Sequence, residues 1–201
     1  MMADSKVSLA KAVRKAKTSG WLLFGYDVPE KPSRIRVRVW RQLKGLGALY
    51  PQMSFCILRD SPQTRSRLED LASSLKAYSP KLIVQAKATN RLYLHTLLTL
   101  FKEDIEKEYR ELAEECEEFL DEIKDSVSSG NVTQTEVSEL EEALEGLGRW
   151  HARTRARDFI GSTAGMKIQR LLRRCRNALL SFSEKAQPAK KNEVPSRRMK
   201  K

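Results

Sequence analysis

The sequence predicts an α+β protein, in which a small antiparallel sheet with two helices is followed by three longer helices. Short apolar runs bounded by Pro, Gly and polar turn residues occur only in the first 90 residues, and such runs are typical of β-strands. Farther along the chain, apolar residues recur every three or four positions, which is the period of an amphipathic helix. At 201 residues, 40% of them apolar, the chain is long enough to bury a core of this size.

The first strand and the first helix are predicted between residues 21 and 47. Residues 21–28 (WLLFGYDV) are apolar and rich in aromatic side chains, and prolines follow them, which favours a buried strand over a helix. Ser33 can cap a helix in which every third or fourth residue is apolar, and glycines end this helix. Its apolar positions are Ile35, Val39, Leu43 and Leu46.

Two further strands, a second helix and a fourth strand follow. Residues 48–58 (ALYPQMSFCIL) predict two short strands with Pro51 at the bend. Ser61 and Pro62 begin the second helix, and residues 81–88 (KLIVQAKA) predict the fourth strand. The resulting order, β-α-β-β-α-β, is the ferredoxin-like split pattern, an antiparallel sheet with both helices on one face.

Three helices are predicted after this domain. The first begins at Arg91, carries apolar residues in alternating steps of three and four, and ends near Gly130. The second covers residues 133–157 and starts with a Thr-x-x-Glu capping box. Gly161 separates it from a last helix whose apolar stripe begins at Ile160. The short connections predict a helical hairpin or bundle.

These elements divide the chain into four segments. We expect a basic arm at residues 1–19, the ferredoxin-like domain at residues 20–90, a helical extension at residues 91–186 and a disordered basic tail at residues 187–201. The three cysteines are far apart and form no CxxC pair, which predicts reduced thiols rather than disulfides or a zinc site. Because no apolar run could cross a bilayer and no signal-peptide pattern is present, we expect a cytoplasmic protein.

Charge is distributed unevenly along the chain, although the total is +12. Residues 101–150 hold 17 acidic and 5 basic residues, a net charge of −12, whereas residues 151–201 hold 15 basic and 3 acidic residues, a net charge of +12. A basic surface attracts polyanions, so nucleic acid is the first partner to consider and an anionic membrane surface the second. Alternatively, the acidic helix and the last basic helices neutralise each other. Since a helix turns only part of its circumference toward one neighbour, we expect some of the arginines to stay free for phosphate.

Two sets of basic residues are the candidate contacts to nucleic acid, because guanidinium groups bind phosphates through pairs of hydrogen bonds. The first set lies on the helix after Ser33 and comprises Arg34, Arg36, Arg38, Arg41 and Lys44. The second set lies on the last two helices and comprises Arg153, Arg155, Arg157, Arg170, Arg173 and Arg174. No helix-turn-helix pattern stands out, so the residues do not indicate how a base sequence would be read.

The residue types do not predict a catalytic site. Asp27 follows the first strand, where two copies in a symmetric dimer could hold Mg²⁺, but an Asp at such a junction more often binds turn amides. His95 and His151 have no second metal ligand or nucleophile at a suitable spacing. We therefore expect no enzyme, no cofactor and no metal site.

Several segments resemble the amino-terminal domain of the chromate-resistance regulator ChrB. The stretch WLLFGYDVPEKPSRIRVRVWRQLKGLGALYPQMSFCIL follows that family's order of hydrophobic strand, P-x-x-P-S turn, R-V-x-x-W-R-x-L helix and L-G-A strand. The resemblance continues through TRSRLEDLASSLKAYSPKLIVQAKA, the acidic FKEDIEKEYRELAEECEEFLDEI and RTRARDFIGS, and so reaches from residue 20 to residue 182.

The resemblance implies a transcriptional regulator of a chromate-resistance operon, with this amino-terminal region as the part that contacts DNA. The family carries a further carboxy-terminal sensor domain, and we expect this chain to lack it, because it ends in a basic tail. The first half also resembles the central domain of the phenylacetate regulator PaaX and, more distantly, the small metal-dependent nucleases of CRISPR adaptation, which place an Asp just after the first strand.

Three functional hypotheses follow. The leading one is a ChrB-like regulator or regulatory fragment that binds double-stranded DNA and forms a homodimer through its long amphipathic helices. The second is a non-catalytic protein-interaction module, whose basic surface serves solubility. The third is a metal-dependent nuclease that uses Asp27. The residues do not indicate a small-molecule inducer.

Overall fold

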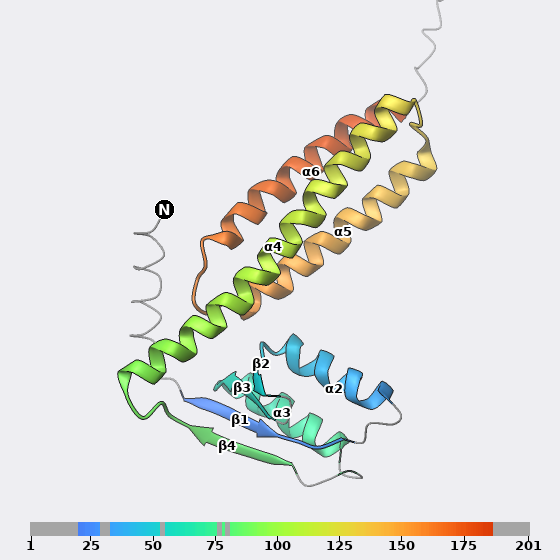
Figure 1. Cartoon of the computed structure of the whole chain (residues 1–201). Coiled ribbons are helices and arrows are strands. Elements are labelled where there is room, and N and C mark those ends of the chain that lie inside the picture. Colours follow the sequence, from blue (N-terminus) through green and yellow to red (C-terminus); the bar gives the residue numbers. More distant parts are fainter. Residues whose placement is uncertain (1–19, 29–32, 53–54, 76–77, 79–80, 187–201) are drawn as a thin grey trace, which may run out of the picture.

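A computed structural model describes residues 20–28, 33–52, 55–75, 78 and 81–186, and the expected basic arm and tail lie outside them. The described residues form an α+β fold, as predicted, with an antiparallel sheet and five helices. The sheet and two helices make one end of the molecule, and three long helices project from it (Figure 1).

The sheet has four strands in the order β2-β3-β1-β4. Their bounds are β1 (Trp21–Gly25), β2 (Leu49–Gln52), β3 (Phe55–Arg59) and β4 (Leu82–Ala86). All neighbouring strands are antiparallel, and β1 is central because Leu23 pairs with Ile57 of β3 on one side and with Val84 of β4 on the other. The prediction that the first strand extends to residue 28 is wrong. It ends at Gly25, which pairs with the first residues of both neighbouring strands, Phe55 of β3 and Leu82 of β4.

Helices α2 (Ser33–Gly45) and α3 (Pro62–Ser74) pack on one face of the sheet. Alternate side chains of a strand point to the same face, so Leu22 and Phe24 of β1 enter one core together with Cys56 and Leu58 of β3. The helices complete this core with Val39, Leu43, Leu68 and Leu71. At the start of α3, the hydroxyl of the capping residue Ser61 accepts a hydrogen bond from the Thr64 amide at 3.1 Å.

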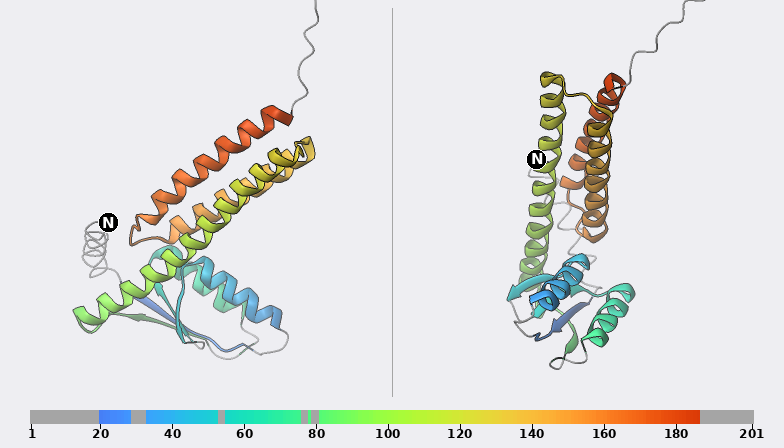
Figure 2. Two further views of the ribbon diagram at one scale, coloured as in Figure 1. Left: turned by 45° about the horizontal axis from the view of Figure 1, so that its top comes forward. Right: turned by 90° about the vertical axis from the view of Figure 1, so that its right-hand side faces the viewer.

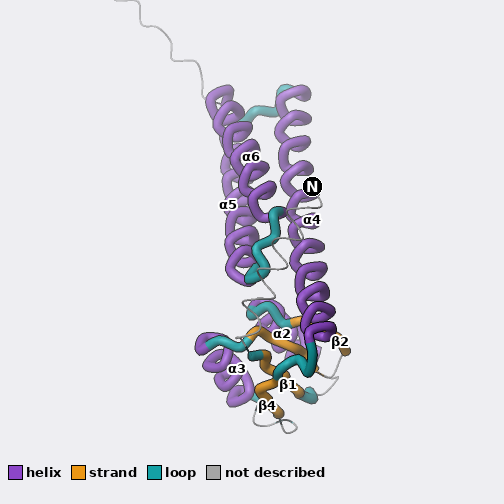
Figure 3. The backbone as a smooth tube through the Cα atoms, turned by 90° about the vertical axis from the view of Figure 1, so that its left-hand side faces the viewer, coloured by secondary structure: helices purple, strands orange, loops and turns teal. Residues whose placement is uncertain are grey.

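The other face of the sheet is covered at one end by the first turns of α4 (Arg91–Ser129). Trp21 of β1 stacks on Phe101 of α4 with ring centroids 5.3 Å apart. Phe159 meets both rings edge to face, at 6.0 and 5.4 Å. This aromatic cluster attaches the long helix to the sheet. Figure 3 shows the amino-terminal end of α4 lying beside the strands.

Helix α4 continues beyond the sheet and packs with α5 (Gln134–Arg157) and α6 (Ala164–Ala186), which confirms the predicted bundle of three helices (Figure 2). Thr133 caps α5 as predicted, since its hydroxyl accepts a hydrogen bond from the Glu136 amide. The prediction that Ile160 begins the last helix is wrong. Gly161, at φ 76°, lies in the connection before α6, and Ile160 packs in the cluster with Trp21.

None of the helices in the described part of the chain is both long and apolar enough to span a membrane.

Candidate nucleic-acid interface

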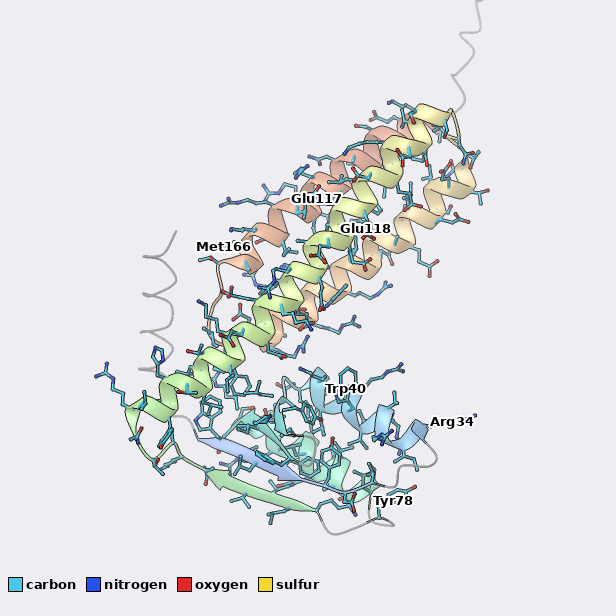
Figure 4. The ribbon with its side chains drawn as sticks, viewed as in Figure 1. Arg34, Trp40, Tyr78, Glu117, Glu118 and Met166 are labelled. Atoms are coloured by element: carbon cyan, nitrogen blue, oxygen red, sulfur yellow. The ribbon has the colours of Figure 1, made fainter. Side chains whose placement is uncertain are left out.

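The first candidate surface is the outer face of α2. Arg34, Arg38 and Arg41 are exposed and lie within one stripe of the helix, because they are spaced by four and three residues. None of the three forms a hydrogen bond or an ion pair with any described residue. Figure 4 shows Arg34 at the end of α2 that is remote from the bundle. This stripe therefore presents three guanidinium groups to solvent.

Arg36 and Lys44 lie toward another side of α2, and only Arg36 is exposed. The Lys44 ammonium group donates to both carboxylate oxygens of Asp104 on α4, at 2.8 and 3.1 Å. Lys44 thus connects α2 and α4 through a partly exposed ion pair. The same side of α2 carries Trp40, which is 48% exposed and which the sequence pattern did not single out as a candidate.

Arg157, at the end of α5, joins the two parts of the molecule. Its guanidinium is ion-paired with Glu108 of α4 and donates a 2.8 Å hydrogen bond to the backbone carbonyl of Lys44. The same Glu108 oxygen accepts hydrogen bonds from Trp150 Nε1 at 2.9 Å and from Thr154 Oγ1 at 2.8 Å. Arg157 therefore has a structural role that the sequence pattern did not indicate.

Arg153 and Arg155 precede it on α5, and both are exposed. Arg155 makes one long hydrogen bond, 3.4 Å, to Gln169 of α6. The side chain of Arg153 contacts no acceptor within the described ranges. It lies instead at a pocket between α5 and the α+β part of the chain.

A further candidate surface lies on α6. Arg170 and Arg173 are exposed, three residues apart on the same face, and no acidic side chain among the described residues pairs with them. Arg174 does pair with Glu117 of α4 at 3.3 Å, but these side chains are 64% and 52% exposed. Exposed pairs of this kind contribute little. Acidic residues of α4 thus pair with Arg157 and Arg174 but not with Arg170 or Arg173.

The residues considered for catalysis lie in three separate parts of the structure. Asp27 is exposed, two residues beyond β1, and the described residues include no cluster of three or more His, Cys, Asp or Glu side chains that could hold a metal ion. His95 is exposed, and the ring Nε2 of His151 lies 3.2 Å from the Gly165 carbonyl oxygen. The three cysteines are buried, and burial raises the pKa of the Cys56 thiol to about 12.

These observations define a class of protein, an α+β unit joined to a three-helix bundle, with exposed arginines on both parts. A family model described as "Protein ChrB, N-terminal" matches residues 36–193, which is most of the chain. The protein therefore belongs to the ChrB amino-terminal family, as the resemblance of its motifs indicated. Searches of curated proteins and of solved structures found no match.

Two arginines near Arg153 were missed in the sequence. The pocket that Arg153 lines is also lined by Arg59, at the end of β3, and Arg67, in α3. Both precede Arg153 by more than eighty positions in the sequence. Neither belongs to a basic run, so no local signal pointed to them. Only the contact between the α+β part and α5 brings them together.

Proposed function

We propose that this protein is a ChrB-like, DNA-associated transcriptional regulator or regulatory fragment without catalytic function. Its membership of the ChrB family supports a regulatory role. The observation that carries DNA association is the stripe of Arg34, Arg38 and Arg41, which are exposed and lack acidic partners in the described ranges. Arginines that are already unpaired can bind phosphate without first breaking an ion pair. The family also suggests a place in the control of chromate resistance.

The α+β part fits a ferredoxin-like domain, with a boundary to the helical extension near residue 90. The strand order β2-β3-β1-β4, the alternation of strands and helices, and the packing of α2 and α3 in one core support this proposal. In such an arrangement the outer face of α2 is turned away from the core and is available to a large polyanion.

Fluorescence anisotropy with a duplex from the gene's own promoter tests DNA association. We expect binding at low salt that weakens steeply as the salt concentration rises, because binding to phosphates releases counterions. A variant carrying Arg38→Ala and Arg41→Ala is expected to bind more weakly. It should also reduce the slope of log K against log salt by about 0.9 for each phosphate that the protein no longer neutralises.

Arg110→Ala is the matched control for that experiment. Arg110 is an exposed arginine on α4, surrounded by the acidic residues of that helix. Its removal is expected to leave the affinity for the duplex nearly unchanged. If the wild-type protein shows no binding at low salt, or if the control weakens binding as much as the α2 variant, the proposed surface is wrong.

A protein-interaction module is the second candidate, because apolar side chains are exposed beside the sheet. Leu92 and Tyr93 in the first turn of α4 are 70% and 60% exposed. Adjoining exposed apolar side chains are typical of interaction sites. Self-association through this surface would give the homodimer that the long helices suggest. Leu92→Glu should then convert a dimer into a monomer in light scattering, while DNA binding by each subunit persists.

A further inference from the structure

Four arginines line a pocket of about 400 Å³ where the end of α5 meets the α+β part of the chain. They come from three elements: Arg59 from β3, Arg67 from α3, and Arg153 and Arg157 from neighbouring turns of α5. No Asp or Glu is among the lining residues. Arg157 is ion-paired with Glu108, but the like charges of the other three repel one another, so the site favours an anion that would neutralise them.

Two of these arginines are held in place by the protein itself. Arg157 is fixed by Glu108 and by the Lys44 carbonyl, and the guanidinium of Arg59 lies over the Phe159 ring, 5.2 Å from its centroid. They form a fixed wall of the pocket. Their positions do not depend on a ligand.

The other two arginines have no such partners. Arg67 and Arg153 are exposed, and neither side chain forms a hydrogen bond or an ion pair with a described residue. An adjoining depression, also lined by Arg67 and Arg153, contains Asp70, but Asp70 pairs with neither of them. Both guanidinium groups can therefore bind a ligand without first breaking an internal hydrogen bond.

The start of α3 adds a partial positive charge to the same pocket. Ser61, Gln63 and Thr64 line it, and they belong to the cap and the first turn of a helix of 13 residues. The Thr64 amide is capped by Ser61 and Pro62 has no N–H, so α3 contributes the positive end of its dipole, which favours a bound anion, more than free amide donors. The helix terminus and the arginines are independent features that meet at one place.

We propose that this pocket binds the phosphate group of a small phosphorylated molecule, with Arg67 and Arg153 as its principal ligands. A tetrahedral dianion offers the oxygen pairs that guanidinium groups bind best. The volume is within the range of small-molecule sites and exceeds the needs of one phosphate, and Leu46 with Phe159 supplies an apolar wall for the rest of the ligand. This proposal goes beyond DNA association and does not depend on it.

Isothermal titration calorimetry of the full chain at low ionic strength tests the proposal with three probes: inorganic phosphate, AMP and adenosine. We expect saturable binding of phosphate and AMP at millimolar concentrations or below, and none of adenosine, which lacks the phosphate. Arg67→Gln and Arg153→Gln should each raise the dissociation constant about tenfold or more, since each removes a charge-assisted hydrogen bond.

Arg110→Gln is the matched control, because Arg110 is an exposed arginine of α4 that does not line the pocket and belongs to neither set of candidate contacts. It should leave both dissociation constants unchanged. Absence of binding by the wild-type protein, or equal weakening by the control, would overturn the proposal. It is also overturned if the pocket variants lose duplex binding while phosphate and AMP still bind, because the pocket arginines would then belong to the nucleic-acid surface. Loss of duplex binding in the α2 variant with intact AMP binding bears only on the proposed function.

Discussion

The carboxylate of Glu108 on α4 is ion-paired with the guanidinium of Arg157 at the end of α5, and the two side chains are only 19% and 14% exposed. The same carboxylate oxygen accepts hydrogen bonds from Trp150 and Thr154, and Arg157 continues to the Lys44 carbonyl in the α+β part. A single acidic group thus joins two helices of the bundle to the carboxyl end of α2.

Removal of that carboxylate should destabilise the protein considerably. In Glu108→Ala the largely buried guanidinium of Arg157 loses its ion-pair partner and the indole N–H of Trp150 loses its acceptor, and we expect the free energy of unfolding to fall by about 3 kcal/mol. Denaturant unfolding measures this change. Glu117→Ala removes the exposed partner of Arg174 and should cost about 1 kcal/mol or less. Equal losses in the two variants would contradict a central role for Glu108.

Gly165 at the start of α6 lies against Tyr109 of α4. A Cβ at this position would be 2.8 Å from the Tyr109 hydroxyl oxygen and 3.1 Å from the ring carbon that bears it. Because both residues are buried, Gly165→Ala should lower the free energy of unfolding by about 1 to 3 kcal/mol.

The same substitution in an open position is the control. Gly148 of α5 has no atom within 4 Å of an added Cβ, and alanine there should stabilise the helix by about 0.5 to 1 kcal/mol. Thermal unfolding of the two variants should therefore shift in opposite directions. A higher melting temperature for Gly165→Ala would show that α4 and α6 are not as close as described.

Asp60, between β3 and α3, should make the stability of the protein depend on pH in the acid range. Its carboxylate accepts two hydrogen bonds from Arg65, each 2.6 Å, and a third from Gln85. The bonds from Arg65, chiefly, hold the pKa of Asp60 below its ordinary value. The stabilisation is present above the pKa of the unfolded chain, about 3.9, and is lost as the pH falls through the lower pKa of the folded state.

We therefore expect Asp60→Asn to be less stable than the wild type at neutral pH and equally stable in strong acid. Unfolding curves measured across this pH range give the comparison. Asp121→Asn, at a side chain that is 66% exposed, should show no comparable loss at neutral pH. A constant difference between wild type and Asp60→Asn at every pH would rule out the linkage.

Cys56 should limit stability in alkali. Burial raises the pKa of its thiol to about 12, whereas the thiol of an unfolded chain ionises at about 8.5. Above that lower value only the unfolded state gains a thiolate, so stability falls until the pH reaches the folded pKa. From this group we expect a loss of about 1 to 2 kcal/mol between about pH 8 and pH 10. Cys56→Ala, less stable at neutral pH, should lack that part of the alkaline loss, and an unchanged alkaline slope would contradict the assignment.

Local patterns were sufficient for the elements of this fold. The Ser-Pro start of α3, the Thr133 cap of α5 and the apolar spacing of α4 depend on interactions within a few residues, and each was predicted correctly. The reciprocal half of the predicted capping box is absent, because the Glu136 carboxylate accepts a hydrogen bond from Ser126 of α4 instead. Ile160 was misplaced because its spacing also fits a helical stripe. The backbone turn at Gly161 and the aromatic cluster at Trp21, which are not properties of spacing, decided its position.

The candidate site divides in the same way. The exposed arginines of α2 follow from the helical period and from which positions are apolar, so the sequence by itself determined that Arg34, Arg38 and Arg41 face solvent. The sequence also determined the α+β class and the family, because both can be recognised from local motifs. Only the tertiary structure decided which basic residues form ion pairs and which remain free. Lys44 and Arg157 are bound by acids of α4, and Arg67 and Arg153 meet at one pocket, because charge pairing depends on distances between elements that lie far apart along the chain.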